Sequence, residues 1–333
     1  MIEKTLLCTT GGLDPYRNLA LEKYLMDSVP EGACLLYLWQ NQNTVVVGRN
    51  QNCWKECRVK ELEADGGHLV RRLSGGGAVF HDLGNLNFTF LVHKQDYDLP
   101  RQLEVILRAV SACGIRAEKS GRNDITAGGR KFSGNAFYFS GGRAYHHGTL
   151  LICADKEKAG KYLSVSAEKI HSKGVDSVRS RIANLDEFRP GLTVKQMKRA
   201  LSEAFGKVYG IRPEAFPPEA ADQSRLKELR RRFADPDWIY GTRMPFSCSF
   251  SRRFGWGGVE IGLQVRGGVI AAARVDSDAM DEEMIRRVAP CLAGCPFSAG
   301  EAAERVRTEF VGETGERKRC AEDLEHLLRE QTF

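Results

Sequence analysis

The sequence lacks the features that direct a chain into or across a membrane. No run of about 18 uncharged apolar residues occurs, so no segment is suited to a transmembrane helix. The N-terminal Met1-Ile2-Glu3-Lys4 places two charges before any apolar stretch, which is unlike a secretory signal peptide. We therefore expect a cytoplasmic protein that does not bind a membrane.

Closely paired cysteines are also missing. None of the ten cysteines forms a CxxC pair, and the lack of an export signal favours reduced thiols over disulfide bonds. Cys53 and Cys57 are four residues apart, as are Cys291 and Cys295, but no histidine-rich segment beside either pair completes a tetrahedral zinc site. We interpret the cysteines as free thiols and assign no metal ligands.

A strong excess of basic over acidic residues, or the reverse, is missing as well. The 49 basic and 43 acidic residues give a formal net charge of +6. This bias is too weak to indicate nucleic-acid binding, although it suits an anionic ligand or an acidic partner. With 333 residues, 42% of them hydrophobic and 28% charged, the chain is predicted to fold as one large and one smaller domain.

Local patterns predict a mixture of helices and strands. Asp14-Pro15 offers an N-cap followed by proline at the first helical position, and Thr193 and Ser298 each begin a capping-box pattern. Further helices are expected over Lys55–Glu63, Leu99–Cys113, Leu226–Phe233, Asp281–Val288, Glu301–Thr308 and Ala321–Glu330. Strands are expected over Cys34–Trp39, Thr44–Val47, Leu69–Val70, Asn85–Val92, Lys131–Phe139, Val259–Val265 and Val269–Val275. We expect the first two strands to form one hairpin and the last two another, with a domain boundary before the second hairpin.

Candidate chemistry first appears in the block from Arg71 to Asp82. Two arginines precede Gly75-Gly76-Gly77. Glycine lets backbone amides approach anionic oxygens, and arginine binds phosphate or carboxylate through paired hydrogen bonds. From glycine content alone, a flexible turn is the preferred interpretation. The block matches neither GxGxxG nor GxxxxGK[ST], so any nucleotide site here is of another type.

Two further blocks contain candidate site residues. The second block runs from Gly121 to Leu150 and includes His146 and His147, and the third is Ser172–Leu185. In Gly121–Gly134, Lys131 suits a negative charge and Asn123 and Asp124 offer oxygens to magnesium, but a solvated lysine and a turn-capping aspartate fit equally well. His146 and His147 point to opposite faces of a strand, so we expect packing or hydrogen bonding rather than a shared metal. The basic segment Ser172–Leu185 suits a solvated loop or one that faces an anion.

Taken together, the three blocks resemble lipoate-protein ligases. The matching stretches are Arg71–Asn85, Gly121–Ile125, Arg130–Gly134, His146–Leu151, Lys173–Leu185, Trp238–Gly241 and Phe254–Glu260. The resemblance implies an α+β fold, in which a large mixed β-sheet catalytic domain of the biotin/lipoate ligase type (residues 1–245) precedes a small α+β accessory domain (residues 246–333).

The resemblance also implies the reaction. ATP, with Mg2+, would activate lipoate to lipoyl-AMP, and a lysine of the acceptor would then attack the mixed anhydride. The implied acceptors are lipoyl domains of 2-oxoacid dehydrogenase complexes or glycine cleavage H protein. Lys131 would be the catalytic residue. The residues implied to bind ATP or lipoate are Arg72, Ser74, Gly75, Gly76, Gly77, Ala78, Val79, Phe80, Asn85, Asp124, Lys131 and His147.

Two alternatives stay open at this point. An octanoyltransferase of the same superfamily needs a nucleophilic cysteine after the lysine block, where Cys153 is the only thiol before Cys248. A non-catalytic module would use basic surface, such as Arg230–Arg232 and Arg252-Arg253, to bind nucleic acid, although solvated helix faces explain those runs more simply.

Overall fold

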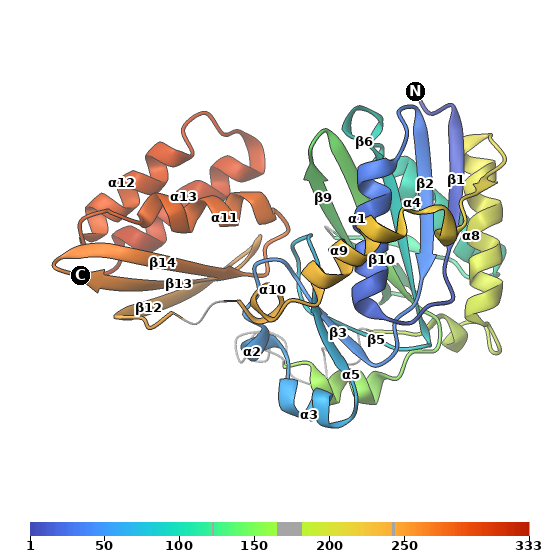
Figure 1. Ribbon diagram of the computed structural model, residues 1–333, viewed down its shortest axis with the longest axis horizontal. Helices are drawn as coiled ribbons and strands as arrows, with labels where there is room; N and C mark the ends of the chain where they lie inside the picture. Colours follow the sequence, from blue (N-terminus) through green and yellow to red (C-terminus); the bar gives the residue numbers. More distant parts are fainter. Residues whose placement is uncertain (122, 165–181, 242–243, 333) are drawn as a thin grey trace. The chain divides into compact units, whose positions relative to one another are not determined.

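The computed structural model describes residues 1–121, 123–164, 182–241 and 244–332 (Figure 1). The chain divides into two compact units, and neither is continuous in sequence. The larger unit comprises Met1–Val47, Cys53–Arg72 and Ala78–Ile239. The smaller comprises Gly48–Asn52, Leu73–Gly77 and the chain from Tyr240 onward. Two short loops from the N-terminal half therefore belong to the C-terminal unit.

The larger unit is built on a mixed sheet of eight strands in the order β11-β1-β2-β6-β10-β9-β8-β7. Neighbours in the β11-β1-β2 part run parallel, and all later neighbours run antiparallel. The strands are β1 (Lys4–Thr9), β2 (Ala33–Trp39), β6 (Asn85–His93), β7 (Glu118–Ser120), β8 (Asp124–Ala127), β9 (Arg130–Ser140), β10 (Arg143–Leu151) and β11 (Glu214–Ala215). This confirms the α+β fold class with a large mixed sheet.

One face of this sheet is apolar. Even-numbered residues of β2 and β6, such as Leu36 and Phe88, pack in the main core with helices α4 (Leu99–Ala112) and α8 (Val194–Tyr209). Helix α1 (Pro15–Ser28) reaches the odd-numbered residues of the same strands, because Glu22 bonds to Thr89 of β6. Helix α9 (Gln223–Phe233) packs along α1 (Figure 1). The two faces of the sheet thus have different helices and, as described below, different polarity.

Two of the three predicted helix N-caps are confirmed. The Asp14 side chain accepts hydrogen bonds from the first turn of α1, and Thr193 and Gln196 form the predicted capping box of α8. Ser298 precedes a helix as expected, but its side chain makes no capping bond. The helix predicted over Lys55–Glu63 is broken into α2 (Cys53–Glu56) and α3 (Val59–Ala64), because Cys57 forms a bridge with Leu163.

The first predicted hairpin is wrong. Strand β3 (Thr44–Val47) does not pair with β2; it is the middle strand of a separate sheet with β4 (His68–Arg71) and β5 (Val79–His81). The intervening backbone is engaged elsewhere, since Asn18 Nδ2 donates to Gln40 O and His68 N donates to Asn43 O. The larger unit also contains helix α5 (Lys156–Tyr162) and all but the last residue of α10 (Pro236–Tyr240).

The smaller unit contains an antiparallel sheet of three strands, β12 (Cys248–Phe254), β13 (Gly257–Arg266) and β14 (Val269–Ser277). Gly267 and Gly268 form the predicted turn between β13 and β14 with positive φ of 57° and 74°, which favours glycine. Helices α11 (Glu282–Leu292), α12 (Ala299–Glu309) and α13 (Gly315–Arg329) share its core. In the described part of the chain, no helix is long and apolar enough to cross a bilayer.

Candidate functional site

The triple-glycine loop is held within the smaller unit. A Cβ atom on Gly75 would lie 2.3 Å from Ala279 O and 2.6 Å from Met280 O, so no larger residue fits without a backbone shift. Gly76 has a φ of 88° and donates its N–H to Ala279 O at 3.0 Å. Two of the three glycines are therefore required by packing and backbone conformation, and the interpretation as an unconstrained turn does not describe them.

The loop Gly48–Asn52 forms hydrogen bonds with the glycine loop Leu73–Gly77 and with its surroundings. Arg49 N donates to Ser74 O at 2.9 Å, and the Ser74 side chain is fully buried. Asn50 accepts from Ser277 N at 2.8 Å and donates through Nδ2 to Glu282 O at 2.9 Å. These bonds tie both loops to the corner between β14 and α11. The predicted residues Ser74, Gly75, Gly76 and Gly77 thus lie in a loop that the C-terminal unit positions.

The two neighbouring arginines have different roles. Arg71 is anchored structurally: its guanidinium donates to the carbonyl groups of Trp238 and Ile239, and the Trp238 indole donates back to Arg71 O at 2.9 Å. Arg72 is buried, with Nη1 donating to Val46 O at 3.2 Å. Burial lowers the pKa of Arg72 to about 10, and the nearby Tyr145 and Glu22 oppose that effect. A buried cation of this kind is a natural anion ligand.

Arg72 lies in an electrostatic cluster with two histidines of the same unit. Burial lowers the pKa of His81 to about 3, and the charges of Arg72 and His147 add to the effect. His81 Nδ1 and Asn41 Nδ2 are 3.2 Å apart. The structure therefore brings together two predicted site residues, Arg72 and His147, and adds His81, which had been placed in the matching block without a role.

The face of the sheet beneath α1 is lined by polar side chains. Asn85, Asn87 and Thr89 are at alternate positions of β6, and His147 is paired with Thr89 across β10. Asn85 Nδ2 donates to Asn87 Oδ1 at 2.9 Å. Among the described residues, Asn85 Oδ1, Asn87 Nδ2 and His81 Nε2 are buried without a hydrogen-bond partner. Unpartnered buried polar atoms are unfavourable in a folded chain, so their gathering here indicates a polar ligand.

Glu22 completes this polar face. Its Oε1 accepts from Thr89 Oγ1 at 2.7 Å and lies 2.8 Å from His147 Nδ1, while the Trp39 indole donates to Thr89 Oγ1 at 3.2 Å. Glu22, which is 1% exposed, is not among the site residues expected from the sequence. A signal was present: Glu22 occupies the buried stripe of α1 between Leu19 and Met26, where a carboxylate requires a partner.

The predicted catalytic lysine pairs with a predicted site aspartate. Lys131 Nζ of β9 lies 2.6 Å from Asp124 Oδ1 of β8, and both side chains are more than one-third exposed. Asn123 and Asn135 hold the adjacent backbone, because each side-chain amide donates to the other's carbonyl group at 3.0 and 2.9 Å. The lysine is thus anchored on a braced strand pair with its charge accessible.

His146 has the opposite environment to His147. It lies between Phe88, Phe90 and Phe137 on the apolar face, bonded to Gln102 and Asn135. This confirms that the two histidines face opposite ways and that each packs or forms hydrogen bonds. No group of three or more acidic, histidine or cysteine residues able to hold a metal occurs within the described ranges.

The remaining predicted residues are placed as follows. Phe80 of β5 is buried and packs against Tyr162, with the two rings tilted by 42° and their centroids 5.4 Å apart, and Ala78 and Val79 are half-buried. Phe132, next to Lys131 on β9, is buried in the main core. Arg122 and most of the third block, residues 172–181, lie outside the described residues.

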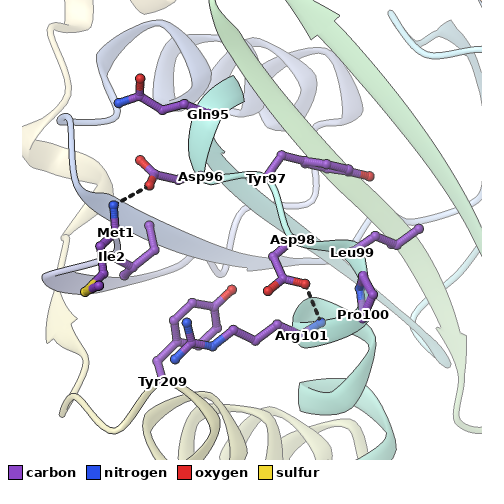
Figure 2. Close-up of a pocket in the computed structure, with 10 residues that line it drawn as sticks. All are labelled: Met1, Ile2, Gln95, Asp96, Tyr97, Asp98, Leu99, Pro100, Arg101 and Tyr209. Carbon is purple, nitrogen blue, oxygen red and sulfur yellow. Dashed lines mark hydrogen bonds and ion pairs between the residues drawn. The ribbon is translucent and has the colours of Figure 1, made fainter.

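Two open hollows of the larger unit lie away from these residues. Figure 2 shows the first, of about 680 Å³, where the Met1 amino group donates to Asp96 Oδ1 at 2.9 Å and Arg101 stacks on Tyr209. The second, of about 640 Å³, is lined by α4 residues such as Arg108 and by Gly128 and Gly129. No predicted site residue lines either hollow.

Comparison with known families gives two matches that together span most of the chain. Residues 14–206 match the family model "Lipoyl protein ligase A/B catalytic domain", and residues 243–328 match "Bacterial lipoate protein ligase C-terminus".

Solved structures with the same fold include LipL1 of P. falciparum in complex with lipoate, which is 27% identical with a TM-score of 0.86 over 98% of this chain and 100% of that one. Lipoate-protein ligase A bound with ATP is 24% identical, with a TM-score of 0.61 over 72% of this chain and 99% of that one. The bi-partite lipoate protein ligase of Thermoplasma acidophilum, solved with its E2 lipoyl domain, is 24% identical, with a TM-score of 0.63 over 74% of this chain and 100% of that one.

Proposed function

Because the chain belongs to the lipoate-protein ligase family, we propose that it activates lipoate with ATP to lipoyl-AMP and then transfers the lipoyl group to a lysine of an acceptor protein. In this proposal residues 1–245 form the catalytic domain and residues 246–333 the accessory domain. The observation that carries the proposal is the buried polar face beneath α1, where Arg72, His81, Asn85 and His147 gather.

This face provides the chemistry for a carboxylate held against a phosphate. The Arg72 guanidinium would bind an anionic oxygen, and the unpartnered atoms of Asn85, Asn87 and His81 would bond to polar atoms of the ligand. The loop Gly75–Gly77 and Ala78–Phe80 would approach the nucleotide with their backbone. Ser74 and His147 complete the proposed lining.

Lys131 would act where charge develops. When the lipoate carboxylate attacks the α-phosphorus, negative charge builds on the phosphate oxygens, and an ammonium group positioned there stabilises it. Removing one such donor commonly costs about 2.7–4 kcal/mol of transition-state stabilisation. The ion pair with Asp124 keeps Lys131 positioned until the nucleotide offers stronger acceptors.

We propose ATP and lipoate as the substrates of this site, and support comes from lipoate-bound and ATP-bound proteins that share the fold. We propose that Mg2+ enters with the ATP phosphates, which supply most of its ligands, as magnesium prefers. Asp124 offers a carboxylate beside Lys131, and we assign no side chain as a magnesium ligand.

The proposed acceptors are lipoyl domains of 2-oxoacid dehydrogenase complexes or glycine cleavage H protein. Support comes from the archaeal relative that was solved with its E2 lipoyl domain. Nucleic acid is not a proposed partner, because basic side chains considered for it form ion pairs, Arg230 with Asp14 at 2.7 Å and Arg252 with Glu330. All ten cysteines carry thiols rather than disulfide bonds, which suits a reducing compartment such as the cytoplasm.

The octanoyltransferase alternative is not favoured. It requires a reactive thiolate, and reactive cysteines have a lowered pKa. Burial, together with Asp186 and Asp82, instead raises the pKa of Cys153.

A transfer assay separates the two activities. The purified chain is incubated with an acceptor domain and lipoate, with and without ATP, and the acceptor is analysed by mass spectrometry. We expect lipoyl-lysine only when ATP is present. Modification from an octanoyl thioester donor without ATP would refute the ligase assignment.

A further inference from the structure

Helix α1 contributes one carboxylate to the interior of the larger unit, at Glu22. The side chain is 2% exposed, and both of its described hydrogen bonds end on a single oxygen, Oε1. One bond comes from the Thr89 hydroxyl and the other joins His147 Nδ1. A buried carboxylate is costly unless it is paired, so this arrangement requires an explanation.

The charged and titratable groups around Glu22 come from several elements. Tyr37 lies on β2, Arg72 follows β4, and Tyr145 and His147 lie on β10, with the Tyr145 and His147 rings 4.7 Å apart. Among these groups, Glu22 is the one carboxylic acid. It therefore faces both the buried guanidinium and the imidazole of the proposed site.

We propose that Glu22 is a positioning residue of the lipoate and nucleotide site, which orients His147 by accepting a hydrogen bond from its Nδ1–H. This rests on the proposed function, in which His147 lines the site. A carboxylate acceptor at Nδ1 keeps the proton on that nitrogen, so Nε2 remains an acceptor, and it also fixes the plane of the ring. In this role Glu22 acts through His147.

Two substitutions of Glu22 distinguish its effect on the orientation of the His147 ring from the effect of its negative charge. Because both bonds end on Oε1, the amide oxygen of Glu22→Gln can accept both and keep the ring in place without the negative charge. Glu22→Ala removes the acceptor altogether. Thr5→Val is the matched control, since Thr5 is equally buried and its hydroxyl donates to Ile211 O at 3.1 Å on a strand outside the cluster.

The first measurement is lipoate-dependent ATP–pyrophosphate exchange, with thermal unfolding in parallel. We expect Glu22→Ala to lose about tenfold or more in kcat/KM for lipoate, as loss of an orienting partner commonly does. Glu22→Gln should recover most of it. Thr5→Val should unfold at a lower temperature with unchanged kcat/KM. A folded Glu22→Ala enzyme with wild-type kcat/KM, or a Gln variant as impaired as the Ala variant, would overturn the proposal.

The second measurement does not depend on activity. Imidazole 1H–15N correlation spectra, with the His147 signals assigned by their loss in His147→Asn, report which nitrogen carries the proton. We expect Nδ1–H in the wild type and in Glu22→Gln, and a shift toward Nε2–H in Glu22→Ala. A wild-type His147 protonated only on Nε2 would refute the role even if Glu22→Ala fails to fold. Absence of exchange in the wild type would instead count against the proposed function and leave this test intact.

Discussion

Replacing Gly75 with alanine tests whether the C-terminal unit positions the glycine loop. The new Cβ would lie 2.3 Å from Ala279 O and 2.6 Å from Met280 O, about 1 Å inside ordinary contact. Relief of such overpacking costs about 1–3 kcal/mol. If the loop moves, the bond from Gly76 N to Ala279 O is also lost, adding about 0.5–1.5 kcal/mol. We expect a destabilisation of about 2–4 kcal/mol.

Urea unfolding of the purified variant, followed by tryptophan fluorescence, measures this loss. Gly77→Ala is the control for stability, because a Cβ there meets nothing within 4 Å and the residue belongs to the same loop. The KM for ATP of Gly75→Ala should rise in parallel, since a displaced loop presents its amides poorly. If Gly75→Ala is as stable as Gly77→Ala and binds ATP normally, the loop is not held in the way described.

Three further predictions follow from the larger unit. Lys131→Ala should fold normally yet lose most lipoate-dependent pyrophosphate release. The control is Lys4→Ala, which removes the ion pair between Lys4 and Glu214, 2.8 Å apart on other strands, and should retain the activity. Near-wild-type turnover of the Lys131 variant would refute the role of Lys131. Arg72→Lys should lower kcat/KM by about tenfold or more, because an ammonium group lacks the planar fork of guanidinium; full activity would show that charge alone suffices. Acid should destabilise the fold, because burial lowers the pKa values of His81 and His146 from 6.5 to about 3. Below pH 6.5 the unfolded chain binds protons at these histidines and the folded chain does not, so the free energy of unfolding decreases as the pH falls toward 3. Between pH 6.5 and 5.5 the two histidines together should cost about 2 kcal/mol, and a flat stability profile over that window would contradict their burial as neutral rings.

Elements with a local signal could be predicted from sequence. Asp14 and Thr193 cap their helices as expected, because a capping side chain reaches only two or three residues along the chain. The turn at Gly267-Gly268 formed for the same reason. The hairpin predicted between β2 and β3 was wrong for the opposite reason. Long-range packing determines which strands pair, and these two strands lie in different sheets.

The candidate site was partly accessible to sequence reasoning. The alternation that placed His146 and His147 on opposite faces needed only the strand period of two. The same period applied to β6 puts Asn85, Asn87 and Thr89 on one face, but the intervening Phe88 and Phe90 make the segment look like an ordinary buried strand. Only the structure shows that α1 covers those polar residues and contributes Glu22 to them.

The contribution of the C-terminal unit to the glycine loop could not be predicted. Gly75 and Ala279 are far apart in sequence, and a close backbone approach leaves no periodic pattern. From the sequence alone, the three glycines fitted a flexible turn at least as well as a loop packed closely against other backbone.

A crystal structure of this protein with lipoyl-AMP would show whether Arg72 and Lys131 bind the activated substrate. We expect the phosphate and acyl carbonyl oxygens within hydrogen-bond distance of Arg72 and Lys131, with polar atoms of the ligand bonded to Asn85 or Asn87. Lipoyl-AMP bound in the hollow of Figure 2, or anywhere that leaves Arg72 without an anionic partner, would contradict it.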